Sequence, residues 1–130
     1  MSQEDIKSVF TEIETLKKLQ HSNIARIYEY QESQEKMYIF MEFCLNGELF
    51  NFINSKGPLS EKFAAKIFKQ ILSALKYLKS QRIFHRDIKC ENILFDKNWN
   101  AKLVDFGFAT KEEEGSFSST FCGSPSYTAP

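Results

Sequence analysis

The sequence carries no excess of charge, because 17 lysines and arginines are balanced by 17 aspartates and glutamates. A basic excess is typical of nucleic-acid binding, and an acidic tail would indicate a solvated segment. Neither is present, and we therefore expect no nucleic-acid partner. Apolar runs are also short: none approaches the ~18 residues of a membrane span, and no signal-peptide pattern opens the chain. These absences predict a soluble intracellular protein without a membrane partner, placed in the cytoplasm, with the nucleus as the remaining alternative.

Cysteine is scarce and irregularly placed. The three cysteines, Cys44, Cys90 and Cys122, are odd in number and form no CxxC pair, which argues against a zinc site or a disulfide framework. We expect free thiols in a reducing compartment. Internal repeats and low-complexity linkers are absent as well. A chain of 130 residues, 42% of them hydrophobic and 13 of them phenylalanine, is long enough for one domain with a core and too short for two.

One polar stretch carries the strongest signal in the chain: His-Arg-Asp-Ile-Lys-Cys-Glu-Asn at residues 85–92, with Asp-Phe-Gly at residues 105–107. Two apolar runs around a polar turn separate the two motifs, which predicts a pair of short strands. Pairing of these strands would bring Asn92, before the first strand, beside Asp105, after the second. Two side-chain oxygen ligands would then converge on a hard cation such as Mg²⁺. A polar turn before a hairpin, without any chemistry, is the alternative interpretation.

The rest of the chain shows the periodicities of helices and strands. Apolar residues recur at spacings of three and four over residues 2–20 and 61–80, which predicts two amphipathic helices, the second with Ser60 as its N-cap. Runs rich in Ile, Tyr and Phe at residues 24–30 and 36–43 predict two strands joined by a polar turn. The stripe expected in the core from the second helix consists of Ala64, Ile67, Phe68, Ile71, Leu75 and Leu78.

Residues 85–92 and 105–107 resemble the catalytic core of the eukaryotic protein kinases, whose loop reads H-R-D-x-K-x-x-N and is followed by D-F-G. The resemblance covers essentially the whole chain. Residues 10–13 and 21–24 match the αC helix and the segment after it. Residues 121–130 are similar to the CGSPxYxAP part of a calcium/calmodulin-kinase-like activation segment.

The resemblance implies a partial protein kinase domain over residues 1–130, with an α+β fold. Residues 1–41 would be the end of the N-lobe, with the αC helix and two strands, and residues 42–46 would be the hinge. Residues 47–130 would form the first part of the mainly helical C-lobe, with the catalytic-loop hairpin, and end in the activation segment. Lys89, in place of the Ala-Arg pattern of tyrosine kinases, implies a protein serine/threonine kinase that uses ATP and Mg²⁺ to modify a protein substrate.

By the same resemblance, four residues would carry phosphoryl transfer. Asp87 would orient the substrate hydroxyl and take its proton, and Lys89 would offset the charge on the transferring phosphate. Asn92 and Asp105 would hold Mg²⁺. Cys90, where proline is commoner in the family, would be structural and have no redox role.

The resemblance also implies a nucleotide site. The backbone of the hinge would recognise the base, with Met41 at the gatekeeper position and Leu94 at the floor of the pocket. Glu48 would meet the ribose or a substrate residue. The implied nucleotide-contacting residues are Met41, Glu42, Cys44, Glu48, Glu91, Leu94 and Asp105. An ordinary strand end at the hinge, and a surface charge at Glu48, are the alternative interpretations.

Four residues would have regulatory roles. Glu12 would pair with the lysine of the third kinase strand, and Thr120 matches the activation-loop site that an upstream activating kinase phosphorylates. A phosphate on Thr120 would add about −1.5 to −2 charge and would pair with Arg86. Ser124 would contact Asp87 and help to select a serine or threonine acceptor.

The chain lacks two parts of the family pattern: no GxGxxG loop precedes the first helix, and no VAIK-type lysine is present to pair with Glu12. The sequence also ends at Pro130, before the later C-lobe helices. Two hypotheses therefore compete. The first is a serine/threonine kinase represented by an incomplete catalytic domain, and the second is a catalytically silent kinase-like fragment that acts as an interaction module. Retention of the four transfer residues together favours the first in origin, because binding alone needs none of them. The missing strands favour the second for this polypeptide taken literally.

Overall fold

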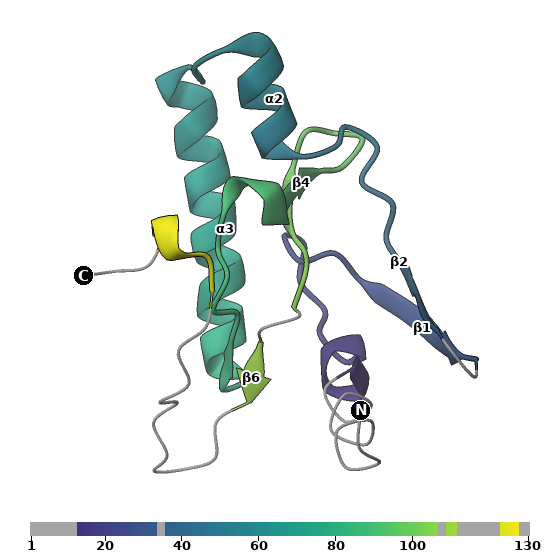
Figure 1. Ribbon diagram of the computed structural model, residues 1–130. Coiled ribbons are helices and arrows are strands. Elements are labelled where there is room, and N and C mark those ends of the chain that lie inside the picture. The colour runs from purple at the N-terminus through teal and green to yellow at the C-terminus, as the bar shows by residue number, and fades with distance from the viewer. Residues whose placement is uncertain (1–12, 34–35, 107–108, 112–122, 128–130) are drawn as a thin grey trace.

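The computed structural model describes residues 13–33, 36–106, 109–111 and 123–127, whose arrangement Figure 1 shows. Residues 13–17 are helical. The later elements are β1 (Ile27–Glu32), β2 (Met37–Met41), α2 (Leu49–Lys56), α3 (Glu61–Ser80), β3 (Ile83–Phe84), the 3₁₀ turn η1 (Cys90–Asn92), β4 (Ile93–Phe95), β5 (Ala101–Leu103), β6 (Thr110–Lys111) and η2 (Pro125–Tyr127). The strands pair as β1–β2, β3–β6 and β4–β5, all antiparallel. This mixture of helices and small sheets confirms the α+β prediction and is consistent with part of a kinase fold.

The long helix α3 has the bounds that the sequence predicts. Ser60 caps it, because its Oγ accepts the N–H of Phe63 at 3.3 Å. The buried residues of the helix are Ile67, Ile71, Ala74 and Leu78. In Figure 1, α2 lies beside one end of α3. The helix therefore presents one apolar stripe along its length to the elements that carry the polar loop.

The prediction is wrong for one residue of this stripe. Phe68 is 66% exposed, although its apolar character suggested a place in the core. Successive helical residues lie about 100° apart around the axis. Phe68 directly follows the buried Ile67 and therefore turns away from the face that the core covers.

The β1–β2 hairpin pairs Ile27 with Met41 and Glu32 with Met37. Both strands are displaced or shortened relative to the prediction, and β1 starts after the expected Ile24. Ile24 instead forms a parallel bridge with Leu103, and the N–H of the next residue, Ala25, donates to the Leu103 carbonyl at 3.0 Å. Residues 24 and 25 are thus tied to β5 rather than to β2.

The hairpin predicted after the polar stretch is confirmed, with Ile93 opposite Leu103 and Phe95 opposite Ala101. Its turn is closed by Asp96, whose Oδ1 accepts the N–H groups of residues 98 and 100 at 2.8 and 2.9 Å. Side-chain acceptors of this kind are what stabilise turns rich in Asp and Asn.

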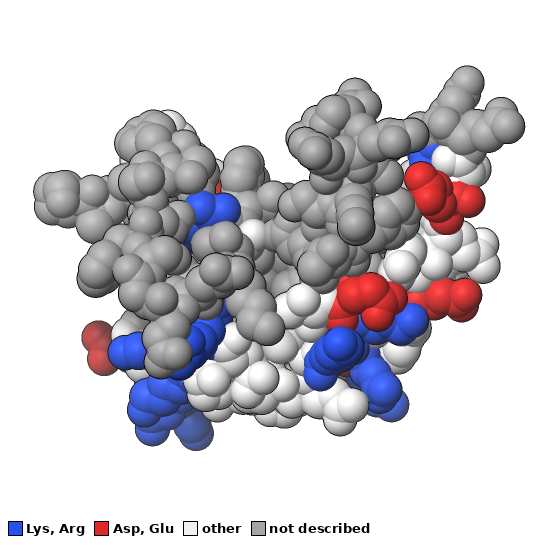
Figure 2. All heavy atoms as spheres, turned by 90° about the horizontal axis from the view of Figure 1, so that it is seen from below, with Lys and Arg blue, Asp and Glu red and all other residues white. Residues whose placement is uncertain are grey.

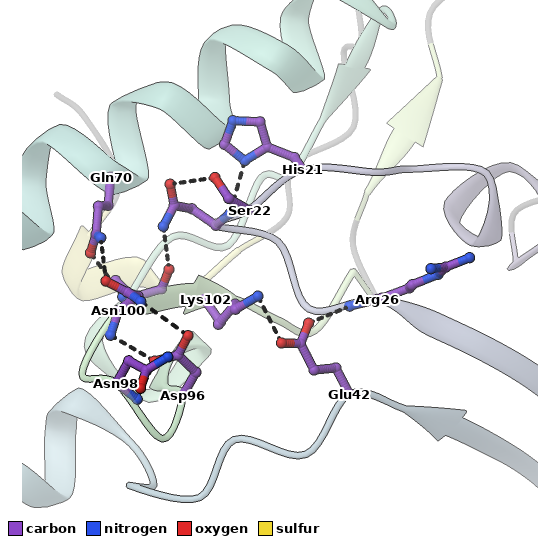
Figure 3. A network of polar contacts seen from close by, with 11 residues as sticks. His21, Ser22, Arg26, Glu42, Gln70, Asp96, Asn98, Asn100 and Lys102 are labelled. Atoms are coloured by element: carbon purple, nitrogen blue, oxygen red, sulfur yellow. Dashed lines mark hydrogen bonds and ion pairs between the residues drawn. The ribbon is translucent and has the colours of Figure 1, made fainter.

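Contacts from two sides fix this β4–β5 hairpin (Figure 3). From α3, Gln70 Oε1 accepts the N–H of Ala101 at 2.9 Å, and Gln70 Nε2 donates to Asn100 Oδ1 at 3.1 Å. From the segment before β1, Asn23 Nδ2 donates to the Ala101 carbonyl at 2.9 Å. Leu103 is fully buried. The residues on either side of the hairpin, 92 and 104–105, are consequently held on a rigid support.

The helix predicted over residues 2–20 lies partly outside the described residues, and within them residues 13–17 are helical. Ile13, Leu16 and Leu19 are buried, as its apolar stripe predicts.

Within the ranges that the structure describes, no helix combines the length and apolar character needed to cross a bilayer. The face of the molecule in Figure 2 carries both basic and acidic side chains, so its charge is mixed, as the balanced composition suggests.

Candidate functional site

The buried His85 holds the polar loop in shape. Its Nδ1 accepts the N–H of Asp87 at 3.3 Å, and its Nε2 lies 2.9 Å from the Val104 carbonyl oxygen. Because Nδ1 accepts, the proton belongs on Nε2, which donates to Val104. Burial lowers the pKa of His85, so this neutral form is maintained at pH 7. The ring also packs on Phe106, with 4.9 Å between centroids.

Asp87 is the centre of the polar cluster, and its side chain is only 1% exposed. Its Oδ2 accepts from Lys89 Nζ at 2.8 Å and from Asn92 Nδ2 at 3.1 Å. Its Oδ1 accepts from the backbone N–H and the hydroxyl of Ser124 at 3.0 and 2.7 Å. Hydrogen bonds from Lys89, then Ser124, lower the pKa of Asp87 from 3.8 to about 2. The carboxylate is therefore ionised at neutral pH.

Lys89 and Ser124 also contact each other, since Lys89 Nζ donates to Ser124 Oγ at 2.9 Å. Asp87, Lys89 and Ser124 thus form a closed set of three mutual contacts between the loop and the segment 123–127. Ser124 lies beside Asp87, where the resemblance placed it. Its effect on the choice of acceptor stays a prediction.

The approach of this segment requires glycine at position 123. Gly123 has φ of 101°, in the left-handed region that side chains rarely adopt, and a Cβ there would lie 2.5 Å from the Arg86 carbonyl oxygen. Arg86 itself has φ of 64°, an uncommon value for a residue with a side chain. Only a residue without a side chain fits this contact without a shift of backbone.

Asn92 directly precedes β4 and Asp105 follows shortly after β5, so both flank the open end of the hairpin. The N–H of Val104 donates to the Asn92 carbonyl at 3.0 Å, which keeps the two ends together. Because Asn92 Nδ2 donates to Asp87, its Oδ1 is the atom that could bind a metal ion. An amide oxygen and a carboxylate suit Mg²⁺, which uses one or two protein ligands and keeps water or phosphate at its other positions. Among the described side chains, His, Cys, Asp and Glu form no group of three that could hold another metal ion.

A cavity of about 680 Å³ lies beside Asp105. Its lining includes Ile27 and Met41 from the β1–β2 hairpin, Leu94 from β4, and Val104 directly after β5. A mostly apolar cavity with a few polar groups is typical of small-molecule sites. Of the predicted nucleotide-contacting residues, the structure brings five together in this lining: Met41, Glu42, Cys44, Leu94 and Asp105.

Both carboxylate oxygens of Glu42 are bound by other groups of the protein. Its Oε1 lies 2.7 Å from Lys102 Nζ, and its Oε2 accepts the N–H of Arg26 at 3.2 Å (Figure 3). Recognition of a base by the hinge backbone stays a prediction. Sequence reasoning missed Lys102. The sequence signal for it is a lysine between two apolar residues of a short strand, because a buried lysine needs a partner for its charge.

Glu48 and Glu91 do not belong to the described lining of the cavity. Glu48 precedes α2, and its Oε2 accepts from Asn51 Nδ2 at 3.1 Å, while its backbone bridges to Leu94. Glu91 lies in η1, and in the described part of the chain its buried Oε2 has no hydrogen-bond partner. Their contact with ribose or substrate stays a prediction.

Two predicted regulatory residues, Glu12 and Thr120, lie outside the described residues. Arg86, the expected partner of a phosphate on Thr120, is partly buried within the loop. Cys44 and Cys90 are free thiols, as expected, and Cys122 is outside the described ranges.

Comparison with known proteins gives a match along the whole chain. The family model described as the protein kinase domain matches residues 1–130. Serine/threonine-protein kinase SIK2 of Gallus gallus is 45% identical over 126 residues, which are 97% of this chain and 16% of that protein. Human NUAK family SNF1-like kinase 2 is 41% identical over 98% of this chain and 20% of its own length. Maternal embryonic leucine zipper kinase of Danio rerio is 45% identical over 98% of this chain and 19% of its own length. The chain thus spans a fifth or less of these relatives.

Proposed function

Because the chain belongs to the protein kinase domain family, we propose that the protein is an ATP-dependent protein serine/threonine kinase. The reaction is transfer of the γ-phosphate of ATP to a serine or threonine hydroxyl of a protein substrate. The names of similar proteins, among them serine/threonine-protein kinase SIK2 of Gallus gallus, support this assignment. A kinase that phosphorylates Thr120, and a cytoplasmic location, belong to the same proposal.

The environment of Asp87 is the observation that carries the proposal. A carboxylate has about four acceptor positions, and at Asp87 four donor contacts hold it ionised and fixed in direction. A hydroxyl already occupies one position at 2.7 Å, that of Ser124. A substrate hydroxyl that takes the place of the Ser124 hydroxyl at Oδ1 would be oriented in the same way, and Asp87 would receive its proton.

Neighbouring groups support the transfer step. Lys89, 2.8 Å from Asp87, would offset charge that develops on the transferring phosphate. Asn92 and Asp105 would hold Mg²⁺, which supplies charge neutralisation to the nucleotide phosphates. Asp105 lines the apolar cavity, so a base in the cavity would place its phosphates toward the Asp87 cluster.

The test is phosphate transfer by the full-length protein with Mg·ATP and a peptide library of serine and threonine acceptors. Replacing Asp87 by Asn should lower kcat by about 10²–10⁴-fold, the usual contribution of a general base. Affinity for Mg·ATP should change little, because Asp87 does not line the cavity. Glu61→Gln, an exposed carboxylate in the first turn of α3, is the matched control and should retain activity. Equal activity of wild type and Asp87→Asn would contradict the proposal, and a wild type that binds partners without transferring phosphate would favour the interaction module.

A further inference from the structure

Glu42, which lines the cavity, forms an ion pair with Lys102 (Figure 3). The distance from Glu42 Oε1 to Lys102 Nζ is 2.7 Å, and the side chains are 24% and 10% exposed. Glu42 is also bound to Arg26 twice: its N–H donates to the Arg26 carbonyl at 2.7 Å, and its Oε2 accepts the Arg26 N–H at 3.2 Å. Glu42 is therefore held by its backbone and by both carboxylate oxygens.

The ion pair connects the residue after β2 to the β4–β5 hairpin, and both of these parts contribute to the lining of the cavity. Glu42 directly follows β2, whereas Lys102 is the middle residue of β5 and pairs with Leu94 of β4. Glu42 and Leu94 both line the cavity. The side chain of Lys102 thus joins the backbone at Glu42 to the hairpin that contributes Leu94 to the cavity.

The hairpin alone does not account for a lysine at this position. The neighbours of Lys102 in β5, Ala101 and Leu103, are both 0% exposed. A lysine in such a strand is unfavourable unless its ammonium is paired. Exposed ion pairs contribute little, but this one is largely shielded from water, so loss of one partner would leave the other charge poorly compensated.

We propose that Lys102 is a positioning residue for the nucleotide, acting through Glu42. The pair fixes the hinge backbone at residues 42–44 relative to Leu94, and so sets the width of the cavity for a flat purine base. This inference rests on the proposed kinase function. Lys102 is not in the described lining of the cavity. Its effect is on where the hinge N–H and carbonyl groups lie.

The experiment compares Lys102→Met and Lys102→Arg in the full-length protein. Lys102→Met keeps the aliphatic stem and removes the charge, so Kd and KM for Mg·ATP should rise about tenfold, the effect of weakening one or two hydrogen bonds. The value of kcat should stay within about twofold, because the Asp87 cluster is not altered. Lys102→Arg restores a donor to Glu42 and should recover most of the affinity. Lys69→Met, at an exposed position of α3, is the matched control and should leave both constants unchanged.

A second measurement separates positioning from general destabilisation. Hydrogen exchange of the nucleotide-free protein should become faster at residues 42–46 in Lys102→Met, while exchange in α3 stays unchanged. Glu42→Gln should give the same local effect, and the double variant should be no worse than the single ones, since both remove one interaction.

Different outcomes refute the two proposals. If wild type binds Mg·ATP and Lys102→Met binds it equally well, the positioning role is wrong and the kinase assignment stands. The positioning role is also wrong if α3 exchange accelerates as much as the hinge, or if kcat falls as much as affinity. If wild type binds no nucleotide at all, the proposed function itself fails, and the role of Lys102 fails with it.

Discussion

The carboxylate of Asp87 shows how local donors set the chemistry of one residue. Two donors reach each of its oxygens, and they lower its pKa from 3.8 to about 2. A carboxyl group with a lowered pKa stabilises the fold at pH values above its unfolded pKa, and this contribution is lost as the pH falls through the folded value. The contribution of Asp87 is therefore constant at neutral pH and lost between about pH 3.8 and about pH 2. Any loss of activity above pH 5 must have another cause.

Replacing Lys89 by Met should raise the pKa of Asp87 toward its ordinary value of 3.8, because the contact with Lys89 is the largest cause of the shift. The carboxyl ¹³C chemical shift of Asp87, followed by NMR from pH 2 to pH 6, reports this pKa directly. The pH window in which Asp87 stabilises the fold should narrow accordingly. Lys97→Met, in the exposed turn of the hairpin, should leave the titration unchanged. A titration of Asp87 that is identical in wild type and Lys89→Met would show that Ser124 and Asn92 suffice to hold the carboxylate ionised.

Sequence alone could name residues whose partners are close in the chain. Asp87, Lys89 and Asn92 lie within one short motif, so their clustering follows from local spacing. The Lys102–Glu42 pair could not be derived in this way, because strand pairing and the packing of two hairpins bring its members together. The family resemblance named Ser124 as a neighbour of Asp87, but the distances of that contact needed the tertiary structure.

At the scale of elements, features encoded by neighbouring residues could be predicted from the sequence, whereas pairing between distant segments could not. The bounds of α3 were predictable, since a 3.6-residue period and an N-cap serine are both encoded nearby in the chain. The β4–β5 hairpin was predictable for the same reason, with Asp96 and Asn100 in its turn. The start of β1 was not, because Ile24 pairs with Leu103 of a distant strand, and no periodicity in its own neighbourhood reveals that partner.

The contact between the loop of residues 85–92 and the segment 123–127 gives a prediction for the variant Gly123→Ala. Gly123→Ala would place a Cβ 2.5 Å from the Arg86 carbonyl oxygen and would force an unfavourable φ. Strain of this kind costs about 1–3 kcal/mol per residue. We expect the segment to move off the loop, Ser124 to lose its bonds to Asp87, and phosphate transfer by the full-length protein to fall at least about tenfold.

Gly57→Ala is the matched control for this variant. Gly57 also has a positive φ, of 84°, but a Cβ there meets nothing within 4 Å. It should therefore show the backbone strain without the clash, and lower the melting temperature while leaving transfer activity nearly unchanged. If the two variants lose activity to the same extent, the close approach of Gly123 to Arg86 is not what organises the site.

At the scale of the whole molecule, one structural core supports both parts of the site. Leu16, Ile27, Phe95, Leu103 and Phe106 belong to a single buried cluster that also includes the apolar stripe of α3. Ile27 and Phe106 of this cluster line the cavity, and the ring of His85 in the loop packs on Phe106. A second, smaller cluster of Ala25, Cys44 and Val104 completes the support of the cavity. Ligand binding in the cavity and metal binding at its edge should consequently both stabilise the fold as a whole.

This linkage can be measured by thermal unfolding of the full-length protein with and without Mg·ATP. A ligand at a concentration of 100 times its Kd stabilises the folded state by about 2.7 kcal/mol, and the melting temperature should rise accordingly. Removing Mg²⁺ with EDTA should abolish most of the rise. Asp105→Asn should behave as wild type does in EDTA, because it replaces the only carboxylate of the proposed metal pair, and it should retain the smaller shift given by adenosine. Asp96→Asn is the control: Asp96 closes the turn of the hairpin, so this variant should melt earlier and still show the full Mg²⁺-dependent rise. A Mg²⁺-dependent rise that persists in Asp105→Asn would exclude Asp105 as a metal ligand, and with it the placement of the phosphates between the cavity and Asp87.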